Sequence, residues 1–214
     1  MGKLFTGFVK VTAFPIEAIV FRAKYHYEDK LMQGRKIKGP AMIVSNHTSI
    51  WDFALVMQTF FGRHIRCLVA DLMFNKSKAM DYLLRHLDAI KISREGKNFS
   101  FIDESVEILK NGGIVEIYPE SRIPIKGEET PLEFKPSFAY IAMLSRAPII
   151  PMYTDGNYFG KGRANVMIGK PIDISTIIDE ELDASDNIKR ITEYVRNKII
   201  ELRDETEERK KAKK

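Results

Sequence analysis

The chain of 214 residues is poor in the side chains that build disulfides and metal sites, with one cysteine and four histidines. A single thiol cannot form a disulfide within the chain, so a reducing compartment is the simpler expectation. Cys67 lies in the apolar run 65–70, where a small buried side chain is expected rather than a nucleophile. His26, His64 and His86 are scattered along the chain without the spacing of metal ligands, and no metal site is predicted.

Several enzyme and targeting signatures are missing as well. The chain has no G-x-S-x-G nucleophile turn and no glycine-rich phosphate loop. Its apolar N-terminal segment is interrupted by Lys10 and Glu17 and contains Pro15, which makes it a poor candidate for a spanning helix of about 20 apolar residues. No small-residue cleavage site follows, which argues against a secretory signal.

Positive charge is concentrated at the N-terminus. Residues 1–40 hold eight Lys or Arg and three Asp or Glu, so the whole net charge of +5 lies there and the rest of the chain is neutral. A basic, apolar segment on a neutral body indicates an anionic membrane surface rather than a nucleic acid as partner. We expect two short amphipathic helices, over about 3–13 and 15–31, that form a membrane-docking segment in residues 1–35. The alternative that they simply pack on the domain remains open.

Residues 36–214 are expected to form one α/β domain. Short β-rich runs alternate with longer helical ones, which is typical of a mostly parallel sheet flanked by helices. The runs expected to be strands are 41–45, 65–70, 89–92, 114–118, 149–153 and 164–168. Helices are expected over 49–61, 76–85, 99–110, 137–146 and 188–208.

The first cluster with chemical content is Asn46-His47-Thr48-Ser49-Ile50-Trp51-Asp52, between a strand and a helix. If the helix starts near Ser49, the ring of His47 can fold back so that Asp52 accepts a hydrogen bond from one ring nitrogen. The other nitrogen could then deprotonate an alcohol without a serine nucleophile. On this segment alone, a helix cap by Ser49 beside an incidental histidine is an equal alternative.

Three further clusters follow predicted strands. Glu120 and Arg122 come after the run 114–118, where α/β proteins place ligands, and arginine can donate two hydrogen bonds to a phosphate. A surface ion pair is the alternative for these two. Arg94 follows the run 89–92. Pro148 and Pro151 bracket a strand and alone would be structural.

Together these four blocks resemble the lysophosphatidic acid acyltransferase family. That family has N-H-x-S-x-x-D, a hydrophobic run that ends in Arg, F-P-E-G-T-R and V-P-I-V-P-V, in this order. The resemblance covers about residues 41–153, and His47 and Asp52 match the first motif. Arg94 matches the second motif, Glu120 and Arg122 the third. The third motif here lacks the glycine and is one residue shorter before Arg122.

The resemblance implies a peripheral or monotopic enzyme at the cytoplasmic face of a membrane. It would move a fatty acyl group from acyl-CoA or acyl-carrier protein to a lysophospholipid hydroxyl, without a metal or bound cofactor. Its preferred acceptor would be 1-acylglycerol 3-phosphate, giving phosphatidic acid. His47 would act as the general base, Asp52 would orient it, and Arg94, Glu120 and Arg122 would hold the acceptor head group. Another lysolipid, glycerol 3-phosphate, a thioesterase reaction and a non-catalytic lipid-binding module are the alternatives.

Overall fold

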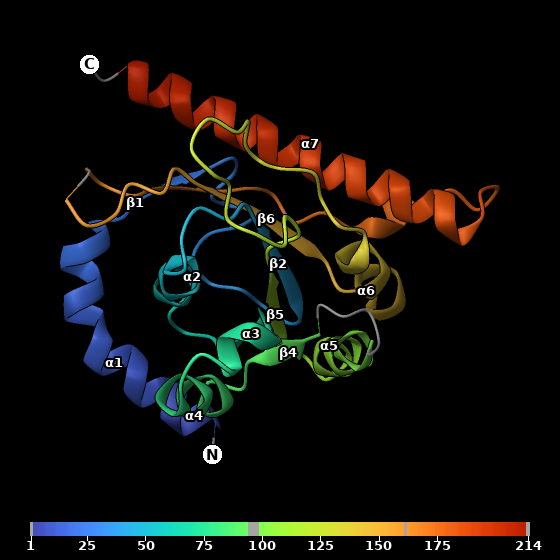
Figure 1. Ribbon diagram of the computed structural model, residues 1–214. Coiled ribbons are helices and arrows are strands. Elements are labelled where there is room, and N and C mark those ends of the chain that lie inside the picture. The colour runs from blue at the N-terminus through green and yellow to red at the C-terminus, as the bar shows by residue number, and fades with distance from the viewer. Residues whose placement is uncertain (1, 94–98, 161, 213–214) are drawn as a thin grey trace.

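A seven-stranded sheet organises the chain (Figure 1), with its strands in the order β1-β7-β6-β2-β5-β3-β4. The computed structural model describes residues 2–93, 99–160 and 162–212. Neighbouring strands pair in parallel except β6 with β7. The expected α/β class with a mostly parallel sheet is confirmed. The strands are β1 (Lys24–Tyr27), β2 (Ala41–Ser45), β3 (Ile65–Ala70), β4 (Ile90–Ile92), β5 (Ile114–Ile117), β6 (Ile149–Thr154) and β7 (Asn165–Ile168).

Helices cover both faces of the sheet, which explains why its central strands are apolar without alternation. All five residues of β2 are buried. One core cluster joins the sheet to α5 (Ser100–Lys110), α6 (Ser137–Ser145) and α7 (Ala184–Lys211). The other joins the opposite face to α2 (Asp52–Thr59) and the end of α1 (Gly2–Phe21). The short α3 (Asp71–Phe74), α4 (Lys78–His86) and η1 (Ile174–Thr176) complete the described elements.

The N-terminal segment differs from the two helices expected there. One helix, α1, runs from Gly2 to Phe21 with Pro15 inside it, and the chain then turns at Arg22, whose φ is 44°. The expected helix over 15–31 is therefore wrong beyond Phe21. Residues 24–27 instead form β1, which pairs with β7 at the edge of the sheet, because the side chains of Lys-Tyr-His-Tyr favour a strand and find an open edge.

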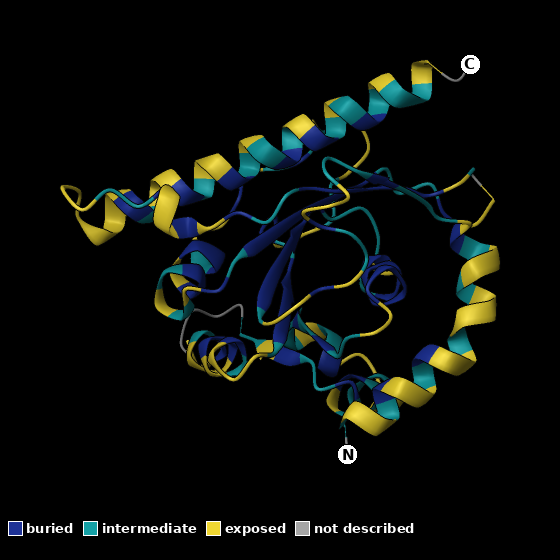
Figure 2. Ribbon diagram, turned by 180° about the vertical axis from the view of Figure 1, so that it is seen from behind, coloured by how far each residue is buried: buried dark blue, intermediate teal, exposed yellow. Residues whose placement is uncertain are grey.

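One face of helix α1 is largely exposed (Figure 2), whereas Lys10 is buried against the domain, which the sequence pattern did not indicate. Lys10 is buried, and its Nζ donates to the carbonyl oxygens of Phe61 (3.2 Å) and Arg63 (2.5 Å). Burial lowers the pKa of Lys10 to about 8 and raises the pKa of the half-buried Glu17 to about 7. By length and composition α1 is a candidate membrane span, contrary to our expectation. Its outward side chains include Leu4, Phe8, Val11, Ile16 and Ile19.

Candidate active site

Two neighbouring strands deliver the candidate residues to one edge of the sheet. β2 and β5 are parallel and in register, with Val44 opposite Ile117. The chain therefore leaves both strands at the same edge, so that His47, after β2, meets Tyr118 and Glu120, after β5. Carboxyl ends of adjacent parallel strands are where α/β folds place ligands.

His47 and Asp52 form the hydrogen bond that the motif spacing indicated. The Nδ1–H of His47 donates to Oδ2 of Asp52 over 2.8 Å. Helix α2 begins at Asp52 rather than near Ser49, so the whole segment between the two residues is a loop that folds the ring back. None of the described residues hydrogen-bonds to Nε2 of His47, and the side chain is 21% exposed. With Nδ1 protonated, Nε2 carries the lone pair and can accept a proton.

The carboxylate of Asp52 is buried and fully occupied. Oδ2 also accepts from the backbone N–H groups of Thr48 (2.6 Å) and Ser49 (2.9 Å). Oδ1 accepts from the hydroxyls of Thr48 and Tyr158, each over 2.8 Å. These donors hold the carboxylate in one position. Asp52 can therefore fix the orientation and tautomer of His47.

The face of the His47 ring rests on Tyr118. The two rings are stacked, with centroids 4.5 Å apart and an interplanar angle of 21°. The Tyr118 hydroxyl donates to the buried carboxyl of Glu116, in the middle of β5. Burial raises the pKa of Glu116 to about 8, and Asp52 adds to this effect. Burial likewise raises the pKa of the Tyr118 hydroxyl and of the Cys67 thiol well above their usual values, so Cys67 is unsuited to act as a nucleophile.

Glu120 lies beside His47, but its carboxylate binds the protein backbone. Oε1 accepts from the N–H of His47 (2.7 Å) and Oε2 from the N–H of Leu132 (2.8 Å). The residue is 4% exposed, and burial raises its pKa while the two N–H donors oppose that shift. Glu120 therefore joins the loop after β2 to the segment before α6 through two hydrogen bonds.

Arg122 is exposed and paired with Glu128 rather than with Glu120. Its two terminal nitrogens donate to the two carboxylate oxygens of Glu128 over 2.7 and 2.6 Å. This pairing lowers the pKa of Glu128 to about 2. Arg94, the other basic residue expected to bind the acceptor, lies outside the described residues.

Three residues of this region were not identified as site residues from the sequence: Asn46, Tyr118 and Tyr158. The amide of Asn46 exchanges two 2.9 Å hydrogen bonds with the backbone of Thr154, which ties the loop after β2 to the end of β6. Tyr158 then reaches Asp52 from the segment beyond β6. Asn46 and Tyr118 lie inside the quoted motifs and could have been singled out, whereas nothing in the local sequence marks Tyr158. No group of three or more potential metal ligands occurs among the residues that the structure describes.

Comparisons with known proteins bear on the family and the fold of the chain. The family model described as "Acyltransferase" matches residues 22–155, more than half of the chain. A 1-acyl-sn-glycerol-3-phosphate acyltransferase of Bacillus subtilis (strain 168) is 26% identical over 138 residues, which are 62% of this chain and 66% of that protein. The crystal structure of the 1-acyl-sn-glycerophosphate (LPA) acyltransferase PlsC from Thermotoga maritima is similar with a TM-score of 0.67 at 20% identity, covering 96% of this chain and 78% of that one.

The structural similarity supports the fold, and the family match covers the segment that carries His47, Asp52, Glu120 and Arg122. The family resemblance inferred from the four sequence motifs is thereby confirmed. The chain belongs to the acyltransferase family.

Proposed function

We propose that this protein is a glycerophospholipid O-acyltransferase that acylates the free hydroxyl of 1-acylglycerol 3-phosphate and gives phosphatidic acid. The donor would be a fatty acyl thioester of coenzyme A or of acyl-carrier protein. The observation that carries the proposal is the His47–Asp52 pair, in which Nδ1 is bonded and Nε2 is available. The name of the similar Bacillus protein supports the choice of acceptor.

The proposed reaction needs no covalent enzyme intermediate. Nε2 of His47 removes the proton from the acceptor hydroxyl while the oxygen attacks the thioester carbonyl carbon. The tetrahedral intermediate collapses with cleavage of the carbon–sulfur bond, and the protonated His47 returns its proton to the departing thiolate. The products are an ester and a free thiol. Asp52 keeps its charge throughout and stabilises the imidazolium.

The acceptor phosphate is assigned to the basic residues that follow β4 and β5, Arg94 and Arg122. The Arg122–Glu128 pair is exposed, and solvent screens such pairs, so a phosphate dianion can replace Glu128 without loss of a buried contact. Arginine suits this role because its fork donates two parallel hydrogen bonds. Glu120 contributes by holding the backbone of His47, as a positioning residue.

The outward face of α1 is proposed to dock on the cytoplasmic face of a membrane, with the protein peripheral or monotopic. Its exposed side chains are mostly apolar, because Lys10 is buried against the domain and Glu17 is half-buried. This surface continues toward the active site through Phe159. The N–H of Phe159 donates to the carbonyl of Val20 near the end of α1, and the ring of Phe159 contacts the ring of Trp51, next to Asp52. Aromatic side chains of this kind favour the membrane–water interface. A lipid acceptor would therefore reach His47 from the bilayer.

A product analysis tests the proposal. The purified protein is incubated with acyl-CoA or acyl-carrier-protein donors and a panel of lysolipids and glycerol 3-phosphate, and the lipids are identified by mass spectrometry. We expect phosphatidic acid from 1-acylglycerol 3-phosphate, and none with His47→Ala. A different esterified acceptor would correct the substrate. Free fatty acid alone would indicate a thioesterase. If no donor released its thiol, the protein would be a non-catalytic lipid-binding module.

A further inference from the structure

A pocket lies at the opposite end of the sheet from His47. It has a volume of about 490 Å³ and is lined in part by Arg63 and His64, which immediately precede β3, and by Gly112 and Gly113, which precede β5. His47 and Glu120 follow the other ends of β2 and β5. Because β2, β3 and β5 are parallel, the pocket lies at the amino ends of these strands and the candidate active site lies at their carboxyl ends.

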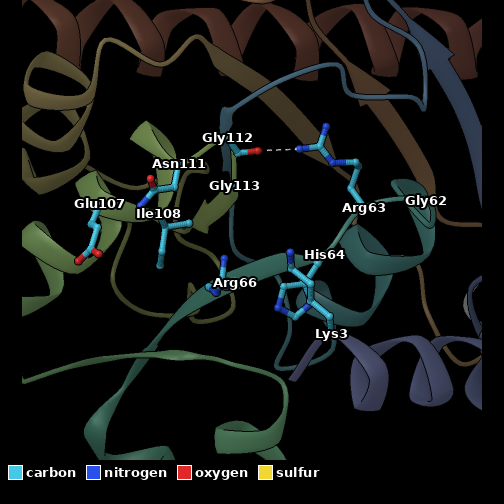
Figure 3. A pocket seen from close by; sticks show the side chains of 10 residues that line it. All are labelled: Lys3, Gly62, Arg63, His64, Arg66, Glu107, Ile108, Asn111, Gly112 and Gly113. Carbon is cyan, nitrogen blue, oxygen red and sulfur yellow. Dashed lines mark hydrogen bonds between the residues drawn. The ribbon is translucent and has the colours of Figure 1, made fainter. Parts of the chain in front are cut away.

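Positive charge dominates this pocket. Its lining includes Lys3, Arg63 and Arg66 but a single carboxylate, Glu107. Figure 3 shows the cationic residues and His64 on one side and the end of α5 on the other. Lys10, which binds the Arg63 carbonyl, adds a further positive charge close by.

The cations differ in how far the protein already uses them. Arg63 is structural, because its guanidinium donates to the carbonyl oxygens of Ile37, Gly39 and Gly112. Neither Arg66 nor Lys3 has a hydrogen-bond or ion-pair partner among the described residues. Arg66 nonetheless lies partly buried against Gly113, where a Cβ would be 3.3 Å from its Nη1. A partly buried guanidinium whose donors are unused points to a missing anion.

His64 supplies a second, independent sign of a missing ligand. Its Nε2 bonds to Oδ2 of Asp88 over 3.0 Å, and its buried Nδ1 has no hydrogen-bond partner among the described residues. Burial lowers the pKa of His64, and the positive charges of Arg66 and Lys10 lower it further. An anion in the pocket would offset those charges, so that His64 could gain a proton and donate from Nδ1.

We propose that this pocket binds a phosphomonoester, with Arg66 as its principal ligand and Lys3 and His64 in support. A dianionic phosphate matches the planar fork of arginine and the net charge of the lining. The site does not depend on the proposed acceptor, because none of its residues belongs to the His47 site.

Two sources of this phosphate are distinguished by experiment. In solution, inorganic phosphate and glycerol 3-phosphate are titrated into the full chain by calorimetry. In the lipid arm, the protein is sedimented with phosphatidylcholine vesicles with or without phosphatidic acid. Both arms compare the wild type with Arg66→Gln, Arg66→Lys and a control, Lys76→Gln, which removes an exposed positive charge beyond the other end of β3.

Arg66→Gln is expected to weaken phosphate binding at least about tenfold, since charge-assisted hydrogen bonds are lost. Arg66→Lys should retain part of the affinity, and Lys76→Gln should bind as the wild type does. The acyl-transfer rate and the KM for the acceptor should not change in Arg66→Gln, which separates this pocket from the active site. A loss of glycerol 3-phosphate binding identifies a soluble phosphomonoester, and a loss confined to phosphatidic acid vesicles identifies a lipid head group. Equal behaviour of Arg66→Gln and Lys76→Gln in both arms would overturn the proposal.

Discussion

Tyr158 donates its hydroxyl to Oδ1 of Asp52 over 2.8 Å, across 106 residues of sequence. The same hydroxyl lies 3.2 Å from Oγ1 of Thr154 at the end of β6. Asp52 is thus held both by its own loop and by the segment that follows β6. The orientation of His47 depends on this remote contact as well as on the motif itself.

Removal of the base should abolish acyl transfer. In His47→Ala we expect kcat to fall by at least about 10²–10⁴-fold, the usual contribution of general base catalysis. The measurement is initial-rate kinetics on protein whose folding is checked by circular dichroism and thermal unfolding. Asp52→Asn is the companion variant and should also lose activity, because its side chain no longer stabilises the imidazolium. A folded His47→Ala protein with wild-type rates would exclude this residue as the base.

Loss of the Tyr158 hydroxyl should have a smaller effect of the same kind. Tyr158→Phe keeps the ring that packs edge-on against Phe21 but removes one donor to Asp52. We expect kcat to fall by about tenfold, since a hydrogen bond to a charged group contributes roughly 1.5–3 kcal/mol. KM for both substrates should stay the same. The control is Tyr153→Phe, which removes the hydroxyl of a buried tyrosine in the core cluster on the other face of the sheet, and its kcat should be unaffected.

Replacement of Arg122 should act on acceptor binding. The arginine would meet a phosphate charge that is present in the ground state and the transition state alike, so Arg122→Ala should raise KM for 1-acylglycerol 3-phosphate and leave kcat nearly unchanged. Lys126→Ala removes a nearby exposed charge and is the matched control. An unchanged KM in Arg122→Ala would assign the head group to other residues.

The buried carboxyl of Glu116 should make stability depend on pH. Its pKa is about 8 in the folded chain against a usual value of 4.5, so the folded state holds a proton that the unfolded state has lost. Between about pH 5 and 8 the free energy of unfolding should therefore fall by up to about 1.4 kcal/mol per pH unit. Above the folded pKa this contribution no longer changes with pH.

Denaturant unfolding of the wild type and Glu116→Gln at a series of pH values measures this effect. In Glu116→Gln, the side chain does not titrate, so the free energy of unfolding should change less between pH 5 and 8 than in the wild type. Glu17→Gln is an informative second variant. The pKa of Glu17 is about 7, so its contribution to the pH dependence of the free energy of unfolding should end about one pH unit below that of Glu116. Parallel stability curves for the wild type and Glu116→Gln would show that Glu116 is ionised in the fold.

The outward face of α1 should carry membrane binding. Replacement of Phe8 and Val11 by Ser should reduce sedimentation with anionic vesicles by about tenfold or more, because each buried apolar side chain contributes roughly 1.5–3 kcal/mol. Thr12→Ala, also exposed on α1, should bind as the wild type does. High salt should release the protein only in part, since it screens the basic residues but not apolar burial. These substitutions test the face more cleanly than a truncation near residue 36, which would remove β1.

Much of the fold was predictable, because the six expected strand runs are rich in apolar, β-branched residues and have few alternatives to buried strands. The strand β1 was not, since Lys24–Tyr27 is short and follows an apolar helical pattern, and only the free edge of β7 selects a strand there. Pro15 indicated a helix start, but α1 continues through it. Tertiary packing decided both cases.

The candidate site was predictable where its residues are close in sequence. The His47–Asp52 hydrogen bond follows from their separation of five positions along the chain. The remaining contacts depend on strand order, which places Tyr118 under His47 and brings Tyr158 to Asp52. The partners of Glu120 and Arg122 also could not be predicted, because the segment before α6 that supplies Leu132 and Glu128 has no periodic pattern.

Helix α1 is joined to the sheet by only Arg22 and Ala23, and β1 follows at once. Phe21, the last residue of α1, is fully buried in the core. Lys10 also bonds to the carbonyls of Phe61 and Arg63, so a tilt of the helix within a bilayer would tilt the sheet with it. The depth at which α1 settles would then determine the height of His47 above the lipid plane, and bilayer thickness itself would become a variable of the reaction rate.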